Sequence, residues 1–180
     1  MYIQSVTKRH LYYGSAIDHT ILPELNELSL EQAQQTQNNK AKYRRLMHYV
    51  HTFWNTYMRY YTNDKIFHID IYAAYLVAPN ACNRVAGYLH LSDYPTITKP
   101  PKLNGAIFVE CKTLRHVLSS AAKNEVTGVL QKARLGIPIG NLLHALQHPQ
   151  LPTPIKKQTI LQQPVSYTTT VIKNVPSHGI

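Results

Sequence analysis

The stretch KIFHIDIYAAYL, residues 65–76, alternates between two sets of side chains. One face would carry Phe67, Ile69, Ile71 and Ala73, and the other His68, Asp70 and Tyr72. A period of two residues is typical of a β-strand that places one face in a hydrophobic core. The sequence therefore predicts a strand over these residues.

Two further strands are expected next, at VAGYLHL (85–91) and AIFVEC (106–111). A loop that carries Pro and Lys, residues 92–105, separates them. Three strands that follow one another in this way predict an antiparallel meander.

A helix is predicted over SSAAKNEVTGVLQKARLG, residues 119–136. Ser119 or Ser120 can cap it, and Gly136 with Pro138 is expected to end it. Its expected apolar stripe, which Glu125 borders, consists of Ala122, Val126, Val129 and Ala133. A second helix at 139–148 and a fourth strand at 152–161 complete a mixed α/β layer.

The first third of the chain is predicted to be helical, over residues 21–35 and 40–54. Ser29 is a plausible N-cap. The second of these helices is expected to bury a stripe of Tyr43, Met47, Val50 and Trp54. Away from the stripe lie Lys40, Lys42, Arg44, Arg45, His48 and His51. These cations form either a basic binding face or an ordinary solvated one.

The charge balance favours polyanionic partners. Lys and Arg total 19 against nine Asp and Glu, which gives a formal net charge of +10. Neutralising phosphates and releasing their counterions requires only clustered cations, so nucleic acid is the simplest partner. After Glu125 the chain has no Asp or Glu, so its last third cannot build a carboxylate metal site.

The compartment is inferred from what the sequence lacks. Cys82 and Cys111 are too few for a disulfide framework and are interpreted as small buried hydrophobes. The start of the chain has no apolar signal-peptide core, and no segment approaches the ~18 apolar residues of a membrane span. We expect a soluble, intracellular protein without a membrane partner.

Four stretches resemble, in order and spacing, the reverse transcriptase and ribonuclease H region of copia-type retrotransposon polyproteins. They are LYYGSAIDHTILPELNEL (11–28), HIDIYAAYLVAPNACNRVAGYLHLSD (68–93), LNGAIFVECKTLRHVLSSAAKNE (103–125) and HPQLPTPIK (148–156). The resemblance implies a helical remnant of the polymerase thumb or connection at 1–61. A ribonuclease H-like domain, with a mixed sheet and flanking helices, would follow at 62–160, and a tail at 161–180.

The same resemblance implies that most of the metal ligands are missing. Tyr72 stands where the family has a catalytic Asp, and Gln158 where it has another. Lys123 replaces the first acidic residue before the helix, while Glu125 matches the second, which binds metal. The family's last helix is not recognisable in the tail. Of the expected ligands, only Glu125 is retained.

Hydrolysis of this type uses two divalent ions, usually Mg²⁺, held by closely placed oxygen ligands. Asp70 cannot simply substitute for an acid at Tyr72, because two residues along a strand span roughly 6.5–6.8 Å. Asp70 and Glu125 would therefore form a weak metal site. The prediction is a domain that does not cut RNA and needs no cofactor, with Mg²⁺ or Mn²⁺ required if it is active.

Three functions stay open at this point: an inactive domain that still binds RNA–DNA hybrid or duplex, an active hybrid-specific ribonuclease, and a basic interaction module. No small-molecule cofactor is expected. The candidate nucleic-acid contacts are Lys40, Lys42, Arg44 and Arg45 on the early helix, with Arg115, Lys156 and Lys157 near the sheet.

Overall fold

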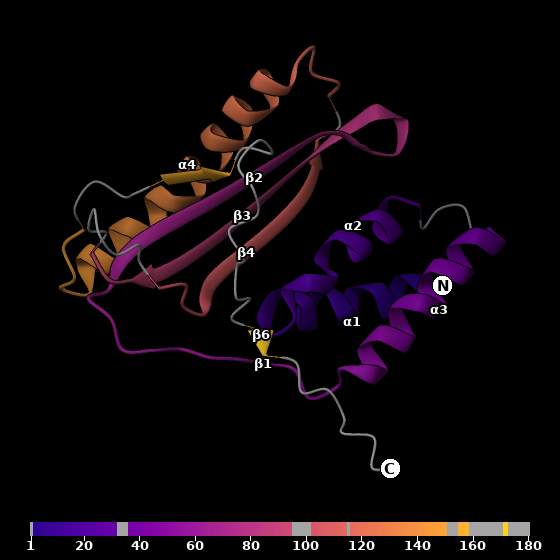
Figure 1. Cartoon of the computed structure of the whole chain (residues 1–180), viewed down its shortest axis with the longest axis horizontal. Helices are drawn as coiled ribbons and strands as arrows, with labels where there is room; N and C mark the ends of the chain where they lie inside the picture. Colours follow the sequence, from indigo (N-terminus) through magenta and orange to yellow (C-terminus); the bar gives the residue numbers. More distant parts are fainter. Residues whose placement is uncertain are drawn as a thin grey trace. The chain divides into compact units, whose positions relative to one another are not determined.

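The computed structural model describes residues 2–31, 36–94, 102–114, 116–150, 155–158 and 171–172 (Figure 1). The chain divides into two compact units. One contains Met1–Arg59 together with Val171–Ile180, and the other contains Tyr60–Thr170. The division at Arg59 lies two residues before the domain boundary expected from the sequence.

The second unit is built on a four-stranded sheet in the order β4-β3-β2-β5. Its strands are β2 (Ile66–Ala78), β3 (Cys82–Ser92), β4 (Ala106–Leu114) and β5 (Ile155–Gln158). β2 and β3 pair antiparallel, as do β3 and β4, whereas β5 runs parallel to β2. The predicted meander is confirmed, and the unit is a mixed α/β layer.

The core lies on the face of β2 that the alternation predicted. Phe67, Ile69 and Ile71 are each at most 2% exposed, and they cluster with Leu89 and Leu143. The last of these belongs to α4 (Ala121–Ala145), which runs along the sheet in Figure 1.

α4 is one helix of 25 residues, so the predicted break at Gly136 and Pro138 and the separate second helix were wrong. Its N-cap is Ser120, whose hydroxyl accepts a hydrogen bond from the Lys123 amide, as predicted. A proline in a helix removes one hydrogen bond to the carbonyl four residues earlier. Pro138 and Arg134, which carries that carbonyl, are both exposed, so water can replace the missing bond.

The predicted apolar stripe of α4 was also largely wrong. Val126 is 68% exposed, although Val129 does pack against the core. The buried positions instead recur every four residues, at Asn124, Gly128, Lys132 and Gly136. Small residues bring the helix backbone close to the sheet, and the strands supply the apolar bulk, so hydrophobic periodicity alone selects the wrong face of the helix.

The first unit is helical, as predicted. It contains α1 (Tyr2–Ala16), a 3-10 turn η1 (His19–Ile21), α2 (Leu22–Glu31) and α3 (Gln37–Thr52). Two short strands, β1 (Tyr57–Met58) and β6 (Val171–Ile172), pair antiparallel. The core of this unit consists of Ile21, Leu25, Leu28 and Leu46. Of the predicted tail at 161–180, only the residues of β6 belong to the described part of the chain.

Two details predicted for these helices were wrong. Ser29 lies inside α2 and its hydroxyl donates to the Leu25 carbonyl, whereas Thr36 is the cap that begins α3. Trp54 is 72% exposed, because α3 ends at Thr52 and its helical period does not extend that far. Within the described residues, the structure contains no helix with both the length and the apolar character that crossing a membrane requires.

Candidate functional site

The positions matched to the family's metal ligands lie on three neighbouring elements of the second unit. Tyr72 is on β2 and Gln158 on β5, and their backbones are partners in the parallel pairing of these strands. Asp70, two residues earlier on β2, has Lys156 as its partner on β5. Two positions far apart in sequence, to which the resemblance assigns acidic ligands, are thus partners in the sheet, and neither is acidic.

Glu125 lies on α4, which packs against one face of the sheet at β2. A Cβ built on Gly128 would lie 3.5 Å from Ile71 Cγ2 and 3.6 Å from Ala73 Cβ, and one on Gly136 would meet Ile69 and Phe67. α4 therefore covers the odd-numbered side chains of β2 and runs antiparallel to that strand. Because side chains alternate along a strand, Asp70 and Tyr72 point away from α4 and thus from the helix that carries Glu125.

Asp70 is engaged by a buried histidine. Its Oδ2 lies 3.1 Å from Nε2 of His90, whose side chain is 3% exposed. The His90 ring stacks on that of His68 at 5.3 Å, and Nε2 of His68 lies 3.1 Å from the Asp93 carbonyl. Alternation placed His68 on the more polar face of β2, but it did not predict that this side chain would be buried.

A buried ion pair between α4 and β4 was not anticipated from the sequence. The Lys132 side chain is 0% exposed, and its Nζ donates to Glu110 Oε2 at 2.6 Å. Lys112 binds the other oxygen of the same carboxylate from the exposed side of the pair. Burial raises the pKa of Glu110, but hydrogen bonds from Lys112 and Lys132 outweigh it and hold the pKa below its usual value.

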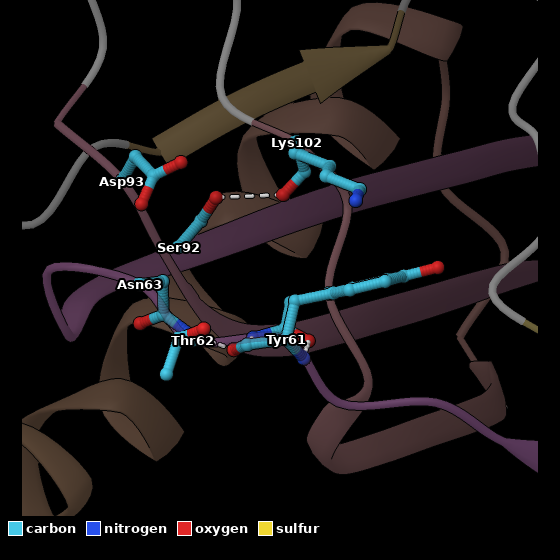
Figure 2. Close-up of a pocket in the computed structure, with 7 residues that line it drawn as sticks. Tyr61, Thr62, Asn63, Ser92, Asp93 and Lys102 are labelled. Carbon is cyan, nitrogen blue, oxygen red and sulfur yellow. Dashed lines mark hydrogen bonds between the residues drawn. The ribbon is translucent and has the colours of Figure 1, made fainter.

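The segment before β2 and the described ends of the connection between β3 and β4 line a small hollow. Figure 2 shows its lining of Tyr61, Thr62, Asn63, Ser92, Asp93 and Lys102. Ser92 Oγ donates to the Lys102 carbonyl at 2.6 Å, and Lys102 Nζ sits 3.4 Å from the centre of the Tyr61 ring. The first contact joins the two ends of the connection between β3 and β4, and the second joins this connection to the segment before β2.

The cations predicted on the early helix separate into two groups on α3. Lys40, Arg44 and Arg45 are exposed, as are His48 and His51. Lys42 lies on a different side, where its Nζ donates to Glu27 Oε1 at 2.5 Å and to Glu31 Oε1 at 3.1 Å. The hydrogen bond with Glu27, opposed by burial and assisted by Glu31, raises the pKa of Lys42. Lys42 is therefore neutralised within the protein.

The remaining predicted contacts cannot be placed as side chains. Arg115 lies outside the described residues. Lys156 and Lys157 are described only through the backbone of β5, in which they pair with Asp70 and Ile71. Within the part of the chain whose placement is described, no group of three or more His, Cys, Asp or Glu side chains is arranged to hold a metal ion.

Comparison with known proteins identified no relative. No protein-family model matches the chain, and no match was found among the curated proteins or the solved structures.

Proposed function

We propose that the chain derives from the ribonuclease H region of a copia-type retrotransposon polyprotein and binds nucleic acid without cutting it. Its second unit would be a ribonuclease H-like domain in which the two-metal site has been lost. Three antiparallel strands, a helix and a further strand follow one another in the order expected of such a core, which supports this assignment.

The pairing of Tyr72 with Gln158 is the observation that carries the proposal. The resemblance assigns metal-binding carboxylates to both positions, and a shared metal site requires such positions to be neighbours. A tyrosine and a glutamine side chain supply no carboxylate to balance two divalent cations. The adjacency of these two positions favours the family assignment, although Glu125 lies on the helix that covers the opposite face of β2 and does not converge with them. The substitutions and this separation favour loss of catalysis.

Asp70 does not restore the missing charge in this arrangement. Its carboxylate is bonded to His90 and lies on the face of β2 that points away from α4 and Glu125. Bridging two metal ions requires oxygen ligands that converge within coordination distance of both. The retained acid and the additional acid therefore cannot form one site without rearrangement of the sheet.

Nucleic-acid binding is proposed for the exposed side of α3, because Lys40, Arg44 and Arg45 have no ion pair within the described residues.

An Arg44→Ala, Arg45→Ala double variant should bind an RNA–DNA hybrid more weakly. Its plot of log affinity against log salt should also be shallower by about 2. Fluorescence polarisation of a labelled hybrid over a salt series measures both quantities.

Lys42→Ala is the matched control, because it removes a cation from another side of the same helix. If affinity for the hybrid depended only on net charge, Lys42→Ala would weaken binding as much as the loss of one of the two arginines. The proposal predicts a much smaller effect, because Glu27 and Glu31 already neutralise Lys42. Equal effects, or no binding of hybrid by the unaltered protein even at low salt, would contradict the binding half of the proposal.

A further inference from the structure

An exposed row of basic side chains on α3 is followed in the chain by an exposed aromatic residue. Lys40, Arg44 and His48 recur every four residues and share one face, which His51 extends by a further turn. From Lys40 to His51 the row measures about 16 Å along the helix axis. Trp54 follows two residues after the helix ends.

Trp54 is the only tryptophan of the chain, and 72% of its surface is exposed. Tryptophan is highly buried on average in folded proteins, since its large apolar surface favours the interior. The neighbouring Phe53 instead packs inward, with its ring centre 5.0 Å from that of Tyr49. The chain therefore uses one of two adjacent aromatic residues for packing and leaves the other largely in solvent, two residues beyond the helix that carries the row.

Charge on this face is of one sign. α3 contains no Asp or Glu, and the carboxylates of Glu27 and Glu31 are bonded to Lys42, away from the row. Cations that follow a backbone, together with an aromatic ring for stacking, are the features by which proteins hold single-stranded nucleic acid. A duplex can satisfy the cations, but its bases are already stacked and offer no free face to the indole.

We propose that Lys40, Arg44, His48 and Trp54 form a binding site for single-stranded RNA or DNA, with phosphates at the cations of Lys40 and Arg44, a hydrogen bond from His48 and one base stacked on the indole. This inference rests on the proposed nucleic-acid binding and assigns the form of nucleic acid that the site selects. Because every base has a stacking face, recognition by Trp54 tolerates any sequence.

The single tryptophan provides a direct readout. Excitation at the red edge of the absorption band, where the tyrosines do not absorb, reports on Trp54 alone. Titration with oligothymidine should quench this emission saturably, whereas the same strand paired with oligoadenine should bind with little quenching. Trp54→Ala should weaken single-strand binding roughly 5- to 100-fold and leave duplex binding nearly unchanged. Trp54→Phe should recover part of the loss.

Two further variants separate stacking from charge. Tyr12→Ala removes another highly exposed aromatic residue, on α1, and should leave both affinities unchanged. Arg44→Ala should weaken both forms and reduce the salt slope for the single strand by about 0.7.

Normal single-strand affinity in Trp54→Ala, with weakened binding in Arg44→Ala, would overturn this inference and leave the proposed function standing. Binding of the duplex alone, without quenching of Trp54 by the single strand, would do the same. If neither form binds at low salt, both this inference and the proposed function fail.

Discussion

Glu110→Ala should destabilise the sheet unit by about 3–5 kcal/mol at neutral pH, because it leaves the ammonium group of Lys132 buried without a counter-charge. Lys132 has no exposed surface, and its Nζ is 2.6 Å from the Glu110 carboxylate. The measurement is the unfolding transition of this unit in urea, followed by circular dichroism.

Lys112→Ala is the matched control for Glu110→Ala. Lys112 binds the same carboxylate, but its side chain is 62% exposed, so its loss should cost no more than about 1 kcal/mol. Replacing both buried partners, with Glu110→Leu and Lys132→Met, should recover most of the stability, because no charge is then left unpaired. If Glu110→Ala lowered the free energy of unfolding by less than about 1 kcal/mol, Glu110 and Lys132 would not form the buried ion pair described.

The ion pair of Glu110 with Lys132 makes the stability of the sheet unit depend on pH. The pKa of Glu110 is lower in the folded protein than its ordinary value, so the unfolded chain binds a proton more readily than the folded one. Its contribution to stability is therefore present above the ordinary carboxyl pKa and is lost as the pH falls through the folded value. The urea midpoint of a Glu110→Gln variant should fall less on acidification than that of the unaltered protein.

Gly136→Ala should destabilise the sheet unit by about 1–3 kcal/mol, although alanine is the better helix former. A Cβ at this position would lie 2.5 Å from Ile69 Cδ1, and Ile69 is buried in the core. The helix or the isoleucine would have to shift, and the surrounding packing resists both movements.

Gly140→Ala tests the same substitution on the same helix with the opposite expected sign. A Cβ at Gly140 meets no atom within 4 Å, so the variant should gain about 0.5–1 kcal/mol from helix propensity alone. Urea midpoints that move in the same direction for the two variants would show that α4 is not seated on β2 as described.

The strands were predictable because their side chains obey a simple period. Residues 65–76 alternate cleanly, and Phe67, Ile69 and Ile71 are buried as that alternation requires. The buried face of α4 could not be predicted, because its residues do not follow a hydrophobic period. Its buried face holds Asn124, Lys132 and two glycines, whose places are set by contacts with the sheet and by Glu110.

The surroundings of the proposed binding residues could not be predicted from the local sequence pattern either. Lys42 and Arg44 are two residues apart in sequence, yet only the structure reveals that Lys42 is paired with acids of α2. Trp54 was assigned to the core because the helical period was extended past Thr52, the last residue of α3. The assignment to a ribonuclease H-like domain stays a prediction supported by the order of the strands and the pairing of Tyr72 with Gln158.

We propose that this chain binds nucleic acid and has lost the metal site of a nuclease. Loss of catalysis can be tested by incubating the protein with an RNA–DNA hybrid labelled on its RNA strand, in the presence of Mg²⁺ or Mn²⁺. We expect no cleavage above that of a Glu125→Gln variant prepared in the same way. Cleavage of the RNA strand by the unaltered protein that Glu125→Gln abolishes would contradict it.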